Sequence, residues 1–316
     1  MRFKSKLISF NFQIVFVEEL SALIVGGRDA DKNSLSTAEI IPPKDNCQIP
    51  NLPEGVHDQP SLIVFDDQIL LCGGENNWDT CLTLQNGKWS QHSKLTESRL
   101  YAASVVTQKA AYLFGGEASR SRSTWEWLPS GSSIWQKGEE SIPGPGLESG
   151  CSVQISPHEI LLIGGNRRSQ QRLKFNMKTH KFEILNQSPQ DARRFFSCIN
   201  FKDDIIIAGG IDSDENFLAS TELLNVKDLT STFGTDMDLK EPRIGHGLVL
   251  VHYNNQPTVL AIGGGYWEGR KLKLSDSIEI WHPTNKTWTL APNLKLLQPR
   301  YSFGFFSVPT RLLCPQ

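Results

Sequence analysis

The sequence predicts an all-β fold in which one small unit repeats six times. Two observations support this prediction. A short apolar strand ending in Gly-Gly recurs six times, and a large residue follows five of the six copies. The first glycines are spaced 47, 42, 49, 45 and 54 residues apart, about 47 on average. A period of this length is typical of propellers and arrays, in which each repeat is one supersecondary unit.

The Gly-Gly strands are the most regular elements. They are ALIVGG (22–27), ILLCGG (69–74), AYLFGG (111–116), ILLIGG (160–165), IIIAGG (205–210) and LAIGGG (260–265). Glycine within a strand usually marks a bulge or a close approach of another backbone. None of these pairs lies in a nucleotide-binding glycine pattern before a helix, so we interpret the pairs as scaffold.

Each unit carries two further landmarks. A large residue follows the Gly-Gly strand in five units and Cys47 holds its place in the first; the others are Trp89, Trp135, Phe182, Phe233 and Trp288. A polar residue then opens the next strand 10 to 13 positions later: His57, Arg99, Glu148, Arg194, Arg243 and Arg300. Alternating segments such as 125–127 and 278–281 predict half-buried strands between the landmarks. Each unit thus has four antiparallel strands, and radial repetition of such blades makes a β-propeller.

The two chain ends are expected to close the ring. The segment from Arg300 has the inner-strand pattern without a following Gly-Gly strand, whereas ALIVGG lacks a clear inner strand before it. Pairing these segments completes a blade and removes open sheet edges. The predicted domains are a propeller over 22–310 and a tail over 311–316. Residues 1–21 are either a signal peptide or an extra N-terminal segment, because a basic start precedes an apolar run interrupted by polar residues.

In its Gly-Gly strands, later Trp and strand-opening Arg, as in PRIGHG at 242–247, the chain resembles the Kelch-repeat family over about residues 22–308. Cys47, Phe182 and Phe233 depart from the Trp of that pattern, and His57 and Glu148 depart from its Arg. The resemblance implies a six-bladed Kelch-type propeller without a BTB domain. It also implies a non-catalytic module that captures a peptide or loop, with acidic peptides among the candidates, on the rim of the central channel.

In Kelch receptors for acidic peptides, arginines at the start of inner strands contact the ligand. The predicted ligand-binding residues are Arg99, Tyr101, Arg194, Arg243, His246, Arg300, Tyr301 and His57. The planar guanidinium group of arginine suits carboxylates and peptide backbones. The competing interpretation is that each arginine braces a neighbouring blade through backbone carbonyls. Loops after the Gly-Gly pairs, with Arg120, Arg122, Arg167 and Arg168, open onto the same face.

Sequence motifs for catalysis are absent. The chain contains no HExxH, no GxSxG and no Cys or His cluster with metal-ligand spacing, so no catalytic residue, cofactor or metal is expected. A copper oxidase related to galactose oxidase is the enzyme alternative, with Tyr101, Tyr301, His246, Cys151 and Cys198 as candidate residues. That alternative lacks a second histidine beside them.

Composition argues against some classes of partner and does not decide the cellular compartment. With 32 basic and 34 acidic residues the formal charge is −2, which argues against nucleic acid. No apolar run approaches the length needed to span a bilayer. Six cysteines allow 15 pairings, of which Cys72–Cys81 is the best local pair, although buried free thiols are the alternative. With sequons at Asn186 and Asn285, these features slightly favour an extracellular over a cytoplasmic protein, and a monomer is expected. A secreted, disulfide-containing propeller binding carbohydrate or a surface ligand is the second functional hypothesis.

Overall fold

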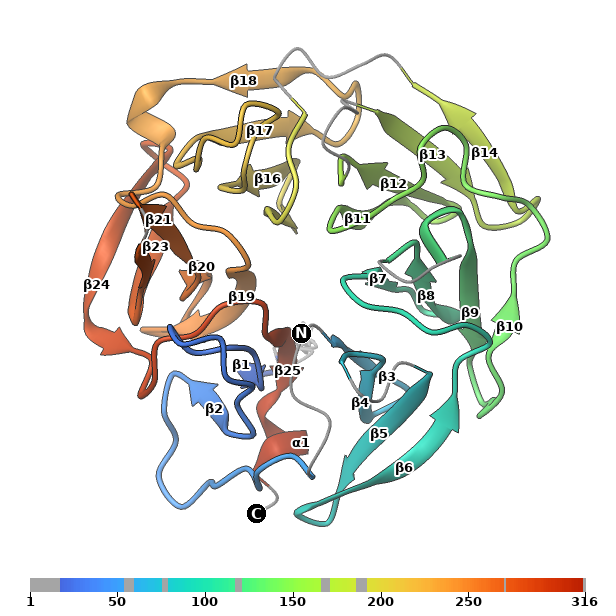
Figure 1. The fold of residues 1–316 in the computed structure, drawn as a ribbon, viewed down its shortest axis with the longest axis horizontal. Coiled ribbons are helices and arrows are strands. Elements are labelled where there is room, and N and C mark those ends of the chain that lie inside the picture. The colour runs from blue at the N-terminus through green and yellow to red at the C-terminus, as the bar shows by residue number, and fades with distance from the viewer. Residues whose placement is uncertain are drawn as a thin grey trace, which may run out of the picture.

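A computed structural model describes residues 18–53, 60–75, 79–116, 121–165, 171–185, 192–269 and 271–314. Six antiparallel sheets stand radially around one axis, as predicted (Figure 1). We number them blade 1 to blade 6 in the order in which their Gly-Gly strands occur along the chain. No helix in the described part of the chain is long and apolar enough to cross a membrane.

Blades 2 to 6 each contain four strands in sequence order from the axis outward. Blade 2 has β3 (Ser61–Phe65), β4 (Gln68–Cys72), β5 (Thr80–Gln85) and β6 (Lys88–Lys94), and blade 3 has β7 (Ala103–Val106), β8 (Ala110–Phe114), β9 (Trp125–Pro129) and β10 (Gln136–Lys137). Blade 4 has β11 (Cys151–Ser156), β12 (Glu159–Ile163), β13 (Arg172–Asn176) and β14 (Lys181–Ile184), and blade 5 has β15 (Ser197–Phe201), β16 (Asp204–Ala208), β17 (Thr221–Asn225) and β18 (Ser231–Phe233). Blade 6 has β19 (Gly247–Tyr253), β20 (Gln256–Ile262), β23 (Ser277–His282) and β24 (Thr287–Lys295), with the hairpin β21 (Gly265–Glu268) and β22 (Lys271–Leu274) inserted.

Blade 1 joins the two ends of the chain, which confirms the predicted closure. Its strands are β2 (Ala38–Ile41), β1 (Leu20–Val25) and the inner strand β25 (Gly304–Pro309). The register of β1 and β25 runs from Leu20↔Pro309 to Val25↔Gly304. The described part of blade 1 has three strands rather than four, because residues 42–53 form no strand. That segment contains four prolines, which supply no N–H for a strand ladder.

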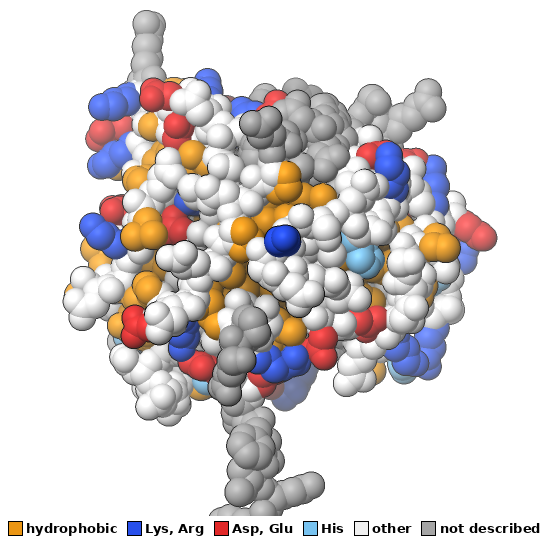
Figure 2. All heavy atoms as spheres, turned by 90° about the horizontal axis from the view of Figure 1, so that it is seen from below, with side chains coloured by type: hydrophobic (Ala, Val, Ile, Leu, Met, Phe, Trp, Pro, Cys, Tyr) orange, Lys and Arg blue, Asp and Glu red, His pale blue; other side chains and the backbone are white. Residues whose placement is uncertain are grey.

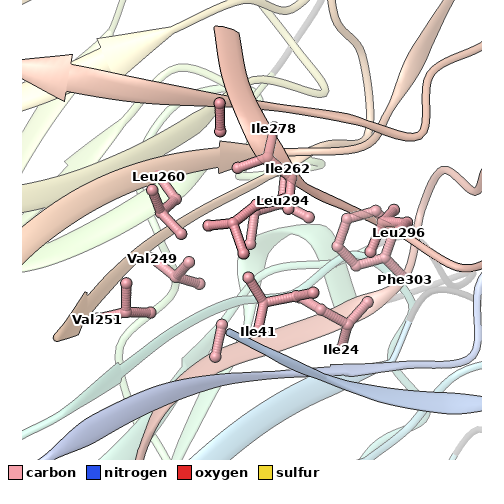
Figure 3. Close-up of a cluster of buried hydrophobic side chains, with 12 residues drawn as sticks. Ile24, Ile41, Val249, Val251, Leu260, Ile262, Ile278, Leu294, Leu296 and Phe303 are labelled. Atoms are coloured by element: carbon pink, nitrogen blue, oxygen red, sulfur yellow. The ribbon is translucent and has the colours of Figure 1, made fainter. Parts of the chain in front are cut away.

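Apolar packing between blades holds the ring together. Between blades 6 and 1, side chains from both sheets interdigitate (Figure 3), with Ile24 and Ile41 of blade 1 against Val249, Leu260 and Ile262 of blade 6. All five are at most 1% exposed. Full burial of an Ile, Leu or Val side chain contributes about 1.5–3 kcal/mol, so each interface is a substantial stabilising unit.

The second glycine of each pair lies where neighbouring blades touch. The amide of Gly116 donates to Leu147 O of blade 4 at 2.8 Å, and its φ is +109°. A Cβ there would lie 2.7 Å from Leu100 O. Glycine is required because a side chain would clash with this backbone oxygen and would be strained at this positive φ.

All six cysteines are paired. Cys72 and Cys81 form the predicted local disulfide between adjacent strands of blade 2. Cys151–Cys198 links the inner strands of blades 4 and 5. Cys47, expected on an outer strand, instead pairs with Cys314 beyond the short helix α1 (Thr310–Leu313). Residues 311–314, expected as a tail, therefore lie against blade 1, and Leu313 is buried.

Candidate functional site

One end of the channel is bordered by a collar of five described residues, one from each of blades 3, 4, 5, 6 and 1. They are Tyr101, Ser149, Phe195, Gly245 and Ser302, and all have φ between 53° and 57°. Backbone hydrogen bonds link four of them across blades: Phe195 N donates to Ser149 O (3.1 Å), Gly245 N to Phe195 O (2.9 Å) and Ser302 N to Gly245 O (2.8 Å). The collar therefore fixes the channel mouth as a rigid feature.

Two aromatic rings meet on this collar. Tyr101 of blade 3 and Phe195 of blade 5 pack edge to face with their centroids 5.1 Å apart. Their collar positions flank Ser149 of the intervening blade, whose small side chain leaves room for the pair. Both residues are only half-buried, so part of each ring is accessible. Amphipathic aromatics that are rigidly held are frequent anchors in protein interfaces.

The collar leads into a channel cavity of about 670 Å³. Residues at and along the inner strands β3, β7, β11, β15, β19 and β25 line it. Among the described residues, the lining includes no Asp, Glu, Lys or Arg. It is built instead from aromatic and aliphatic side chains, several serines, Gln154, Asn200 and His246.

The predicted binding arginines Arg99, Arg243 and Arg300 are not accessible in the channel. Their exposures are 2%, 0% and 0%. Arg243 donates through Nη1 to Gly263 O (2.6 Å) and through Nη2 to Glu279 Oε1 (3.0 Å). The expectation that these groups face a partner is therefore wrong, because each guanidinium forms its hydrogen bonds inside its own blade. The structure supports a brace through backbone carbonyls, but the braced blade is the arginine's own and not the neighbouring blade that was expected.

The fourth brace is Arg193 rather than the predicted Arg194. Arg193 Nη1 donates to Gly209 O (3.1 Å), the carbonyl equivalent to Gly263 O in blade 6. Arg194 points elsewhere: its side chain is 12% exposed and pairs with Glu215 at 2.8 Å. A sequence signal for braced blades was available, since a Ser/Thr-x-Glu triplet follows the Gly-Gly strand in these units. The triplets are 37–39, 124–126, 220–222 and 277–279.

The glutamate of the triplet completes the brace in three blades. Glu39 Oε1 accepts from Arg300 Nη2 at 2.6 Å, and its Oε2 accepts from Leu297 N at 2.7 Å. Both partners of this ion pair are nearly inaccessible. Removing one partner of such a pair leaves an uncompensated buried charge, so the braces are stability elements.

Three described arginines near the collar each pair with a carboxylate. Arg28 contacts Glu75 at 2.5 Å, and Arg122 contacts Glu148 at 2.8 Å. Arg194–Glu215 is the third pair. The side of the ring at blades 1 and 2 likewise mixes acidic and basic groups (Figure 2). These three described arginines are therefore opposed by carboxylates and do not form the unopposed positive patch that capture of an acidic peptide would favour.

His246 is a buried wedge between blades 5 and 6. A Cβ on Gly209 would lie 2.7 Å from its Cε1, and Phe196 and Phe303 occupy the same place on Gly164 and Gly263. Neither ring nitrogen has a hydrogen-bond partner among the described residues. Burial, followed by the charge of Arg243, lowers the pKa of the imidazole from 6.5 to about 3. His246 is thus neutral near pH 7.

The remaining predicted site residues do not form one group in the structure. Tyr301 precedes the collar residue of its blade, and its backbone pairs with Arg28, so it is not equivalent to Tyr101. His57, Arg120, Arg167 and Arg168 lie outside the described residues. Sequence reasoning missed Phe195 and Ser149, because only the shared left-handed backbone shows that they belong with Tyr101.

The cysteines proposed for an oxidase site are committed to another bond. Cys151 and Cys198 are joined to each other, so neither sulfur is available for a cross-link to tyrosine. Within the described ranges, no group of three or more His, Cys, Asp or Glu residues could hold a metal ion.

Comparison with known proteins shows the fold. No protein-family model matches the sequence, and no curated protein matches it. The structure is similar to the solved structure of YjhT, a Kelch-repeat protein, with a TM-score of 0.64 and 15% sequence identity. The match covers 80% of this chain and 88% of that chain. The chain is thus a six-bladed β-propeller whose similarity to a Kelch-repeat protein is structural.

Proposed function

We propose that this chain is a Kelch-type propeller that acts as a non-catalytic protein-binding module. The proposed site is the collar face, and the ligand is a peptide or loop of a partner protein. The observation that carries the proposal is the half-buried Tyr101–Phe195 pair, in which Phe195 is held by interblade hydrogen bonds of the collar. Hot spots in interfaces are enriched in such anchors, surrounded by polar contacts that exclude water.

The structure changes the kind of partner that we expect. Three of the arginines that favoured an acidic peptide are internal braces, and Arg194 is already paired with Glu215. A segment with an apolar or aromatic side chain suits the collar better, because it can pack on Tyr101 and Phe195. The balanced ion pairs around the collar then form a polar rim.

The experiment compares partner capture by matched variants. Tyr101→Asn with Phe195→Asn removes both rings, and Asn tolerates the left-handed backbone at these positions. Ile134→Ser is the control, because it removes an apolar side chain that is 72% exposed away from the collar. Quantitative mass spectrometry of captured proteins should show a partner lost from the double variant and retained by the control. Retention of the same proteins by the double variant would refute the proposal.

A secreted propeller that binds carbohydrate or a surface ligand is the second candidate. The three disulfides favour it, since such bonds persist in oxidising compartments. Saturable binding of the purified protein to a glycan array, unaffected by loss of the two collar rings, would favour this function over the first.

A further inference from the structure

We infer that the channel interior binds an uncharged aromatic small molecule that carries hydrogen-bonding groups. This inference concerns the cavity behind the collar and does not depend on a protein partner at the collar face. The cavity of about 670 Å³ falls in the range of pockets that enclose a drug-sized ligand. Such pockets are mostly apolar with a few polar groups that orient the ligand.

The uncharged character of the described lining indicates the ligand class. In the described part of the lining there is no carboxylate, ammonium or guanidinium group. His246 is kept neutral by burial, and the nearby Arg243 is fully buried and paired. Against this described lining a charged ligand would lose its hydration without gaining a counter-ion, which is strongly unfavourable. A neutral ligand avoids this penalty.

The walls offer aromatic surfaces. Phe305 and Phe306 of β25 line the cavity and are only half-buried. Phe303 and Phe305 pack edge to face with centroids 5.9 Å apart, which leaves ring faces and edges of defined orientation. Aromatic rings prefer offset-stacked or edge-to-face partners. A planar ring in the channel can adopt either arrangement.

Side-chain amides of the lining can orient a ligand through hydrogen bonds. Gln154 is half-buried and Asn200 is exposed, and both line the cavity. The hydroxyls of Ser149 and Ser152 have no partner among the described residues, but they are buried and present almost no surface to the cavity. Elsewhere in the channel, inner-strand amides are already capped, as where Leu248 N donates to Ser197 Oγ at 3.0 Å. A ligand hydroxyl or carbonyl that pairs with the side-chain amides of Gln154 and Asn200 replaces the hydrogen bonds that it loses with water.

The test uses two probes of similar shape and different charge. 2-Naphthol is uncharged at pH 7, and 2-naphthoate is an anion. Both are titrated into the purified, disulfide-intact protein and followed by calorimetry and by ligand-observed NMR. We expect saturable 1:1 binding of 2-naphthol and binding of 2-naphthoate that is weaker by about tenfold or more. Equal affinities, or no saturable binding of 2-naphthol, would overturn the inference.

Two variants test whether the probe binds in the channel. Ser104→Phe fills space at a half-buried lining position on β7, and Asn200→Asp adds a negative charge at the lining with little change in volume. The control is Ser90→Phe on the exposed surface of β6. Both channel variants should weaken 2-naphthol binding by about tenfold, whereas the control should not.

If Ser104→Phe fails to fold, Asn200→Asp still decides the question. Undiminished binding by a folded channel variant would show that the probe binds elsewhere and would refute the inference. These titrations contain no partner protein, so their failure leaves the proposed collar function standing, and failure of partner capture leaves this result standing.

Discussion

Replacement of His246 by Phe should remove a specific part of the acid sensitivity of this protein. The imidazole is 2% exposed and its pKa in the folded state is about 3, against 6.5 when solvated. Below pH 6.5 the unfolded chain therefore binds a proton that the folded chain excludes. The stability contributed by this group is complete above pH 6.5, and it is lost progressively as the pH falls from 6.5 towards 3.

The magnitude follows from the two pKa values. Between pH 7.5 and pH 5.0 the penalty from His246 is about 2 kcal/mol, at about 1.4 kcal/mol per pH unit below the solvated pKa. At pH 5.0 the folded-state pKa has little influence, because the folded group is still unprotonated. All other titrating groups are shared by the two proteins, so their contributions largely cancel in the difference.

Urea unfolding at pH 7.5 and pH 5.0 measures this difference. The wild type should lose about 2 kcal/mol more than His246→Phe over this interval. Phenylalanine fits because Phe196 and Phe303 fill the equivalent places in neighbouring blades. His158→Gln, at an exposed position, controls for removal of an imidazole. Parallel losses in wild type and His246→Phe would refute the argument that His246 is a neutral interblade wedge.

The other predictions concern stability and redox state. Arg243→Met should destabilise the fold by about 3–5 kcal/mol in chemical unfolding because it leaves Glu279 buried without its charge partner, and the double change with Glu279→Leu should recover much of that loss. Arg194→Ala should change the unfolding free energy by less than about 1 kcal/mol, since its partner carboxylate is exposed. Joint replacement of Cys47 and Cys314 by Ser should cost up to about 5 kcal/mol, because that disulfide closes a 267-residue loop, whereas loss of the 9-residue disulfide in blade 2 should cost about half as much. Alkylation of the denatured, unreduced protein should modify no cysteine, and after reduction it should modify six; a labelled thiol before reduction would contradict the pairing.

The repeat pattern accounts for how much of the fold could be predicted. Each Gly-Gly strand is a local apolar run, so its position follows from neighbouring residues. Counting the predicted strands indicated that the two chain ends close the ring, and the pairing of β25 with β1 confirms this prediction. That blade 1 lacks an outer strand in its described part was harder to predict. Cys47 occupies the repeat position of the large residue, and its pairing with Cys314 depends on the distant C-terminus.

The candidate site was harder to predict. An arginine at the start of a strand looks the same in sequence whether its guanidinium faces the channel or its own blade. What separates the two is a glutamate elsewhere in the chain, 27 residues away for Arg99 and 261 for Arg300, and contact between them exists only after the blade has formed. Arg193 and Arg194 are adjacent in the sequence, yet Arg193 is the brace and Arg194 lies on the rim.

From the sequence alone, six repeats, their strands and the closure of the ring were determined, because these depend on local apolar patterning and on repeat number. Tertiary structure decided which polar groups remain accessible. It buried three arginines in carboxylate and carbonyl cages, brought Tyr101 and Phe195 together from separate blades, and left the described channel lining without ionised side chains. Burial and pairing depend on neighbours contributed by other blades, and a linear pattern does not specify those neighbours.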